Sequence, residues 1–181
     1  MAVLAVSTVV EPPAPEARPS IMELTAGQEH IVGWAVELFD EADLDLPAVT
    51  FVRFDSQERC FGRRGAHIVE DGRSVIRICN DDIDRSAERV MLHELAHAWD
   101  RHALTEERRA DFLRLRHLRV WRSKDAEWEE KGAEQAAEVL VWGLIDWDFS
   151  AQIPDNTCIE LLRGYVTLTG RQPLHGFTGK C

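Results

Sequence analysis

The sequence predicts an α+β domain in which a small sheet of about three strands packs on helices. Two patterns indicate this class. Short runs rich in β-branched and aromatic residues are confined to the stretch between residues 48 and 79. Apolar residues recur at helical spacing on both sides of that stretch. A sheet segment followed by a run of helices is typical of α+β proteins.

Three runs are expected to form the strands. Residues 48–54 alternate in the manner of a half-buried strand. Residues 66–70 and 74–79 flank the letters DGR, which favour a tight hairpin turn. A sheet of this size has an exposed edge, and residues 66–70 are the first candidate for it.

Helices are expected before and after the sheet. Thr25 is a plausible N-cap for the first helix, in which apolar residues recur at helical spacing. The later helices are expected over about 85–100, 105–121, 132–146 and 155–169. The helix expected at 105–121 is rich in arginine, and the one expected at 132–146 carries an alanine-rich apolar stripe.

The length of 181 residues favours one domain. Residues 1–22, with four prolines in the last part, are expected to be a disordered or linker segment before a domain at 23–181. The formal net charge of −11 makes general nucleic-acid affinity unlikely, since such binding needs cations. No segment is long and apolar enough to predict a membrane span.

The four cysteines form no Cys-x-x-Cys pair, which disfavours a zinc ribbon or a thioredoxin-type motif. Cys60 with Cys79 is the first disulfide to consider, although four reduced cysteines in a cytosolic protein are equally consistent with the sequence. The cytoplasm is slightly favoured as the location. Export would require the apolar residues 2–10 to be the trimmed end of a signal peptide.

Two histidines lie on the apolar helix expected at 85–100. His93 and His97 are four residues apart in the letters HELAH, so both imidazoles share one helix face. They can occupy two corners of a zinc tetrahedron. Glu94 points about 100° away and is placed to reach a metal-bound water rather than the metal itself. A pair of half-buried histidines without a metal is the plainer alternative.

A catalytic zinc normally takes three protein ligands and a water. The elongated motif with a third histidine is excluded, because Asp100 and Ala103 stand where it needs glycine and histidine. On the helix expected at 132–146, Glu134 and Glu138 share one face. Glu134 is the candidate third ligand, and Glu138 can accept a hydrogen bond from the second nitrogen of His93.

Other interpretations of these acidic residues stay open. Glu134 and Glu138 can also be two solvated carboxylates, and three further glutamates in a more polar run compete as ligands. These three are Glu127, Glu129 and Glu130.

The letters HELAHAW, followed 37 residues after His97 by EQAAE, resemble the gluzincin metallopeptidases. The stretch at 132–144 also looks like small metallopeptidase-like proteins of actinobacteria and phages. The resemblance implies a minimal zincin-like fold with an active-site helix and a downstream glutamate helix. It implies Zn²⁺ held by His93, His97 and Glu134, and it places Glu138 where the family usually has aspartate.

The function expected on this basis is zinc-dependent hydrolysis of peptide bonds, with Glu94 as general base and a peptide or protein as substrate. An extended peptide is expected to pair with the 66–70 edge. Three further residues are weaker candidates for a group that stabilises the transition state, and each is more readily explained as structural. They are His67, Tyr165 and His175.

Two other functions are consistent with the motif. A deformylase-like amide hydrolase would use a cysteine ligand, for which Cys60 and Cys79 are the candidates. A catalytically inactive, metal-stabilised module would bind a partner or nucleic acid through the arginine-rich helix. That helix lies in residues 101–124, which hold eight basic and three acidic side chains. A solvated helix face is the simpler explanation for such a run.

Overall fold

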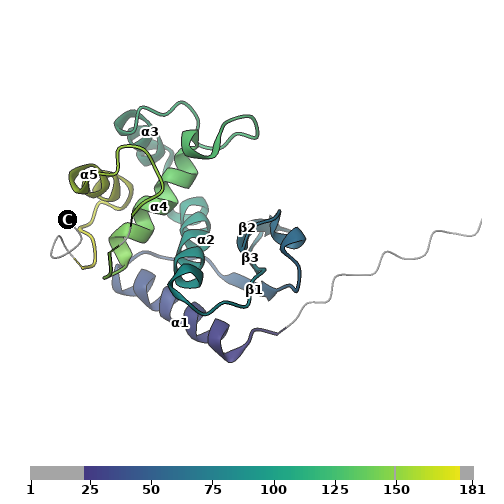
Figure 1. The fold of residues 1–181 in the computed structure, drawn as a ribbon. Helices are drawn as coiled ribbons and strands as arrows, with labels where there is room; N and C mark the ends of the chain where they lie inside the picture. Colours follow the sequence, from purple (N-terminus) through teal and green to yellow (C-terminus); the bar gives the residue numbers. More distant parts are fainter. Residues whose placement is uncertain (1–22, 149, 176–181) are drawn as a thin grey trace, which may run out of the picture.

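A computed structural model describes residues 23–148 and 150–175 of the chain. Within these ranges the expected α+β class is confirmed, with five α-helices and one three-stranded sheet. Helix α2 (Arg85–Ala103) lies between the sheet on one side and α4 (Gly132–Leu144) on the other, as Figure 1 shows. The other helices are α1 (Ala26–Glu41), α3 (Glu106–Leu115) and α5 (Cys158–Thr169). The expected linker at 1–22 lies outside the described residues.

The sheet consists of β1 (Val49–Arg53), β2 (Gly65–Glu70) and β3 (Arg73–Ile78), in the order β1-β3-β2. The central strand β3 is parallel to β1 and antiparallel to β2. Asp71 and Gly72 both have positive φ, as a two-residue hairpin turn with the natural strand twist requires. Strand β2 is an edge of the sheet, as expected for residues 66–70.

Helix α4 is the most deeply buried element. Nearly all of its residues are shielded from solvent, because α2 packs on one side of it and α5 on another. Gly143 is required for the second contact, since a Cβ atom there would lie 2.1 Å from the ring of Tyr165. The position of α4 is therefore fixed from both sides, which matters because it supplies part of the candidate site.

The prediction for the arginine-rich helix was wrong at its C-terminal end, since α3 stops at Leu115 rather than near residue 121. His117 adopts the left-handed conformation, and the amide of Leu118 donates to the carbonyl of Leu113, which closes the helix as in a Schellman motif. Glycine usually marks such an end, and here a histidine takes its place.

The arginines of this region are not simply a solvated face. Arg116 is buried and donates to the side chain of Gln135 and to the carbonyls of Pro154 and Asp155. Arg108 donates to the last carbonyls of α5. These two cations therefore connect α3 and its C-terminal end to neighbouring elements.

A disulfide joins Cys60 to Cys79, the pairing favoured from the sequence. It fixes the short 3₁₀ helix Gln57–Cys60 to the end of β3 and closes a small apolar cluster on the outer face of the sheet. Cys158 is disulfide-bonded as well, and Cys181 lies outside the described residues.

A search of the described helices for a membrane span found none with the necessary length and apolar character.

Removing the Cys60–Cys79 bond is expected to lower the free energy of unfolding by about 3 kcal/mol, because the bond closes a loop of 19 residues in the unfolded chain. Urea unfolding of the double alanine variant measures this. Each single alanine variant loses the same bond and should lose at least as much stability. An unfolding midpoint equal to that of the wild type would show that the bond does not constrain the chain.

Candidate metal centre

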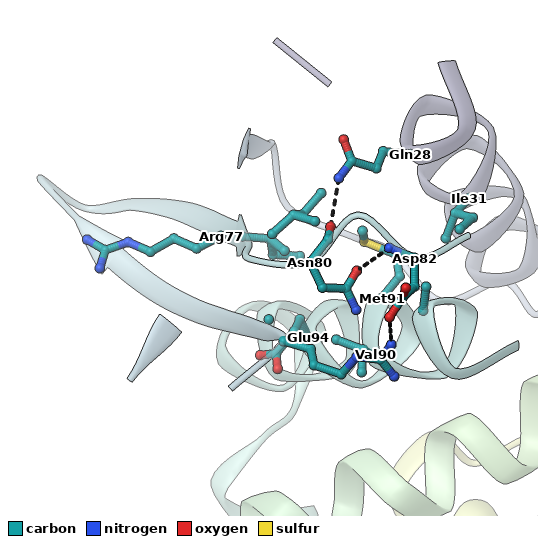
Figure 2. Close-up of a pocket in the computed structure, with 13 residues that line it drawn as sticks. Gln28, Ile31, Arg77, Asn80, Asp82, Val90, Met91 and Glu94 are labelled. Carbon is teal, nitrogen blue, oxygen red and sulfur yellow. Dashed lines mark hydrogen bonds and ion pairs between the residues drawn. The ribbon is translucent and has the colours of Figure 1, made fainter. Parts of the chain in front are cut away.

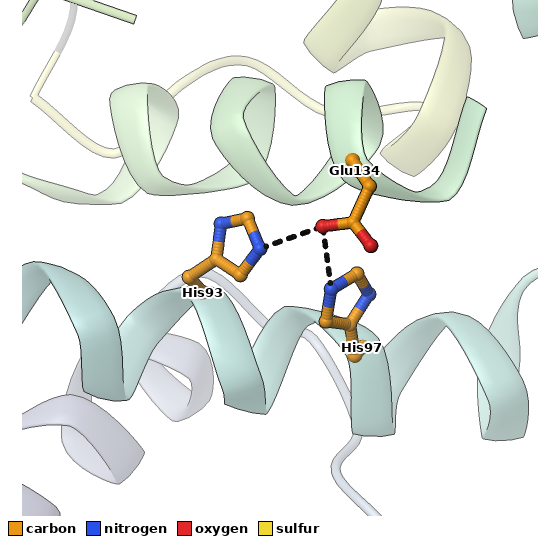
Figure 3. Close-up of side chains that lie close together, drawn as sticks. All are labelled: His93, His97 and Glu134. Atoms are coloured by element: carbon orange, nitrogen blue, oxygen red, sulfur yellow. Dashed lines mark hydrogen bonds and ion pairs between the residues drawn. The ribbon is translucent and has the colours of Figure 1, made fainter. Parts of the chain in front are cut away.

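Three potential metal ligands converge between α2 and α4. His93 and His97 extend from α2 toward α4, and Glu134 extends from the first turn of α4 to meet them (Figure 3). Oε2 of Glu134 lies 3.2 Å from Nε2 of His93 and 3.3 Å from Nε2 of His97. The ligand atoms of all three residues lie within 4.8 Å of one another.

The distances from Glu134 to the two histidines are close to those around a tetrahedral ion. With bonds of roughly 2.0–2.2 Å, two ligands at tetrahedral corners lie about 3.3–3.6 Å apart. The two contacts of the Glu134 oxygen are close to that range. The arrangement leaves one corner for water, so these three residues can hold a divalent metal in an open site.

The start of α4 is built to place Glu134. A Cβ atom at Gly132 would lie 2.7 Å from both Leu113 and Trp121, so only glycine lets the helix begin here. The amides of Gly132 and Ala133 donate to the carbonyls of Val120 and Trp121, which satisfies two donors of the first turn. Glu134 thus lies at the positive end of the helix dipole, which favours a carboxylate.

Glu138 lies one turn further along α4 and is fully buried. One of its oxygens lies 3.1 Å from Nδ1 of His93, and both accept from the Arg89 guanidinium at 2.8 and 2.9 Å. The amide of Gln152 donates to it at 3.0 Å. With Nδ1 of His93 donating to Glu138, its Nε2 is turned toward the ligand cluster. Burial opposes ionisation, but these partners outweigh it and lower the pKa of Glu138.

Without a metal, the same groups favour a protonated His93. Burial disfavours a charged His93, but hydrogen bonds to Glu134 and Glu138 outweigh burial and raise the pKa of this imidazole to about 10. Burial likewise opposes ionisation of Glu134, and the hydrogen bonds to His93 and His97 outweigh it and hold its pKa well below the usual range. A cation between these groups is therefore strongly favoured, whether it is a proton or a metal ion.

Glu94 leaves α2 toward the sheet rather than toward α4. Its side chain is only 7% exposed, and its Oε2 accepts a hydrogen bond of 2.7 Å from the backbone amide of His67 on β2. Glu94 and His93 line the same cavity, which has a volume of about 260 Å³ and extends past Trp128. Glu94 thus faces the space beside the ligand cluster without belonging to it.

A second, narrow cavity reaches Glu94 from between α1, β3 and α2 (Figure 2). Its volume is about 20 Å³, room for about one water molecule. None of the three candidate ligands lines it. The hydrogen bond from Gln28 to the carbonyl of Asn80 joins α1 to the segment after β3 at its rim. This cavity is therefore a small gap in the packing of α1, α2 and β3, separate from the ligand cluster.

The three weaker candidates, His67, Tyr165 and His175, lie in different parts of the structure. Tyr165 is fully buried against α4, and His175 lines a different pocket, beside Trp34. Of the three, only His67 lies near the ligand cluster, where it lines a cavity together with His97. We call this cavity and the cavity lined by His93 and Glu94 the two halves of the cleft. Burial, with the positive charges near it, lowers the pKa of His67 to about 4, so its ring is neutral at pH 7.

Two residues of the site were not anticipated. Arg89 binds Glu138, and its position four residues before His93 on the same helix face was a usable signal. Trp128 stacks on the ring of His93 with the two centroids 6.2 Å apart. Nothing in the spacing of the sequence pointed to that contact.

Comparison with known proteins gives no relative: no protein-family model, no curated protein and no solved structure matches this chain. The resemblance to gluzincins therefore rests on its two short motifs, and the metal centre rests on its own geometry.

Metal binding at pH 7–8 should release about one proton from His93, because its pKa of about 10 means that the metal-free imidazole carries the extra proton there. The apparent affinity should therefore rise with pH, by about tenfold per unit for this one proton, until the pH nears that pKa. Calorimetry in two buffers with different heats of protonation measures the release. A metal affinity that stays constant between pH 6.5 and 8 would contradict the assignment of the released proton to His93.

Proposed function

We propose that this protein is a zinc-dependent metallopeptidase that hydrolyses peptide bonds. The observation that carries the proposal is the convergence of His93, His97 and Glu134, whose ligand atoms lie within 4.8 Å of one another, with Glu94 buried beside them. Two imidazoles and one carboxylate around an open position are typical of catalytic zinc.

The donor set favours a transition metal, of which zinc is the one we propose, over magnesium and calcium. Magnesium and calcium prefer sites built from oxygen, whereas this site offers two imidazole nitrogens. Structural zinc sites normally use four protein ligands, and this cluster offers three. The site therefore supports a catalytic rather than a purely structural ion.

Zinc bound at this site would acidify its water and polarise the carbonyl group of a substrate. Glu94 would be the group that accepts a proton from that water and delivers it to the leaving amine. The amide of His67 holds one oxygen of Glu94, which fixes the orientation of the carboxylate. Glu138 keeps the proton of His93 on Nδ1, so that Nε2 stays available to the metal.

The substrate path follows the free edge of β2. Gly65 lines the cavity on one side of the ligand cluster, and His67 lines the cavity on the other side. The outer edge of β2 therefore runs along both halves of the cleft, and an extended peptide can add to it as a further strand. Because the amide of His67 already donates to Glu94, it is not free to pair with a substrate. A bound peptide therefore pairs with the positions of β2 on either side of His67.

The two alternative functions are less well supported by the geometry. A deformylase-like site needs a thiolate ligand, and both Cys60 and Cys79 are tied in a disulfide. A binding module that uses the arginine-rich helix needs free cations there, whereas Arg108 and Arg109 bond to groups of the protein itself.

Replacing Glu134 by alanine should abolish stoichiometric zinc binding, because two imidazoles alone hold the ion weakly. Elemental analysis of the purified protein measures the zinc content. Glu129, an exposed glutamate of the preceding 3₁₀ helix, gives the matched control: Glu129→Ala should retain the metal. Retained zinc in Glu134→Ala, or its loss in Glu129→Ala, would assign the third ligand to another carboxylate.

Replacing Glu94 by glutamine should leave the zinc content unchanged and reduce peptide hydrolysis by about 10²–10⁴-fold, the usual contribution of a general base. Mass spectrometry of a diverse peptide mixture incubated with the protein detects cleavage whichever peptide is the substrate. Glu107→Gln, on the exposed side of α3, removes the same charge and should keep full activity. Full activity in Glu94→Gln would refute the assignment of this residue as the base.

A further inference from the structure

Positive side chains surround the half of the cleft next to His97. A cavity of about 380 Å³ opens there, and Glu134 and His67 lie in its wall together with His97. The remaining charged side chains of the wall are all cations, and we call them the basic wall: Arg101, Arg122, Lys124 and Lys131. They line one cavity in a chain with a net charge of −11.

The fold holds the basic wall beside the candidate ligands. Arg101 follows His97 by four residues on α2, and Lys131 precedes Glu134 by three residues at the start of α4. Both cations therefore share a helix face with a ligand. Arg122 and Lys124 come from the segment 116–131, which runs between α3 and α4 (Figure 1).

The segment 116–131 is anchored by one buried carboxylate. Asp100 is 2% exposed, accepts a hydrogen bond of 3.1 Å from the indole of Trp121, and forms ion pairs with Arg122 and Arg109. In addition, Val120 and Lys131 form a bridge between the two ends of the loop. The basic wall is thus presented by a fixed piece of backbone.

Three of the four cations of the basic wall have no acidic partner among the described residues. Across residues 23–148 and 150–175, no carboxylate lies within ion-pair distance of Arg101, Lys124 or Lys131. Arg122 shares the single charge of Asp100 with Arg109. The one acid in the cavity wall, Glu134, is directed toward the two histidines. The cavity therefore offers a net positive field to whatever enters it.

We propose that the basic wall selects acidic peptides, with an aspartate or glutamate side chain close to the scissile bond; the inference rests on the proposed peptidase function. In an extended peptide along β2, every second side chain points the same way, so alternate positions can present carboxylates to this wall. Complementary charge raises the rate of encounter and rejects basic sequences.

A peptide fits this field better than a nucleic acid does. Outside residues 101–124 the chain has 13 basic and 29 acidic side chains, which repel a polyanion that extends over the surface. A short acidic peptide needs to meet only the cleft. Nucleic-acid binding is therefore kept as an outcome that would overturn the proposal.

The test measures binding to the zinc-loaded Glu94→Gln protein, so that the peptides are not consumed. The probes are two fluorescein-labelled decapeptides, one alternating alanine with glutamate and the other alternating alanine with glutamine. Fluorescence anisotropy in about 50 mM salt should show the glutamate peptide binding at least about tenfold more tightly. Equal affinities, or no binding of either peptide, would overturn the proposal.

A matched pair of triple variants assigns the preference to the basic wall. Arg101→Gln/Lys124→Gln/Lys131→Gln should reduce the preference for glutamate to less than about threefold. Arg73→Gln/Arg114→Gln/Arg163→Gln removes the same charge from positions elsewhere and should keep the preference. The zinc content of each variant verifies its fold. If the variant with Arg101, Lys124 and Lys131 replaced loses zinc, the double variant Arg101→Gln/Lys124→Gln takes its place, since both of these side chains are exposed. An equal loss of preference in the control variant would refute the role of the wall.

Competition with a 20-nucleotide single-stranded DNA completes the test. Failure of the DNA to displace the glutamate peptide supports the proposal, and displacement at lower concentration than the unlabelled peptide overturns it. The peptidase function is judged separately, from hydrolysis by the wild type that is lost in Glu94→Gln. Hydrolysis without a preference for acidic peptides would refute only the present inference, and the preference without hydrolysis would refute only the peptidase function.

Discussion

The packing of α2 against α4 is the contact on which the candidate site depends. Its centre is the buried carboxylate of Glu138, which binds Arg89 and His93 of α2 and the amide of Gln152. A buried charge is stable only when its hydrogen-bonding capacity is filled, so these partners fix the spacing and rotation of the two helices. The same rotation brings Glu134, one turn earlier, against His93 and His97.

Helix α2 separates two tasks by its geometry. Successive residues of a helix point about 100° apart, so His93 faces α4 while Glu94 faces β2. His93, the candidate metal ligand, is thereby oriented by its contacts with α4. Glu94, the proposed base, is oriented by its contact with β2. A substrate on the edge of β2 would lie in the groove between them, where both can act on it.

The sequence predicted the parts of this site that depend on local spacing. Two histidines four residues apart share a helix face whatever surrounds them, and the same rule relates Glu134 to Glu138. The hairpin of β2 and β3 was visible because Asp71 and Gly72 favour its turn. The end of α3 was not visible, because His117 takes a left-handed conformation that usually calls for glycine.

The basic wall was only partly visible in the sequence. Arg101, Arg122 and Lys124 belong to the basic run 101–124, but nothing in the sequence placed them beside the ligand cluster or joined Lys131 to them. Arg101 and Lys131 are 30 residues apart in the chain, and they line the same cavity because α2 packs against the start of α4. Composition pointed the other way, since a net charge of −11 disfavours anionic partners. Net charge, however, describes the field at a distance, and salt screens that field beyond about 8–10 Å. Inside the cavity, the few nearest charges decide which ligand enters. An acidic protein can therefore favour acidic peptides at one site, while the rest of its surface repels longer polyanions.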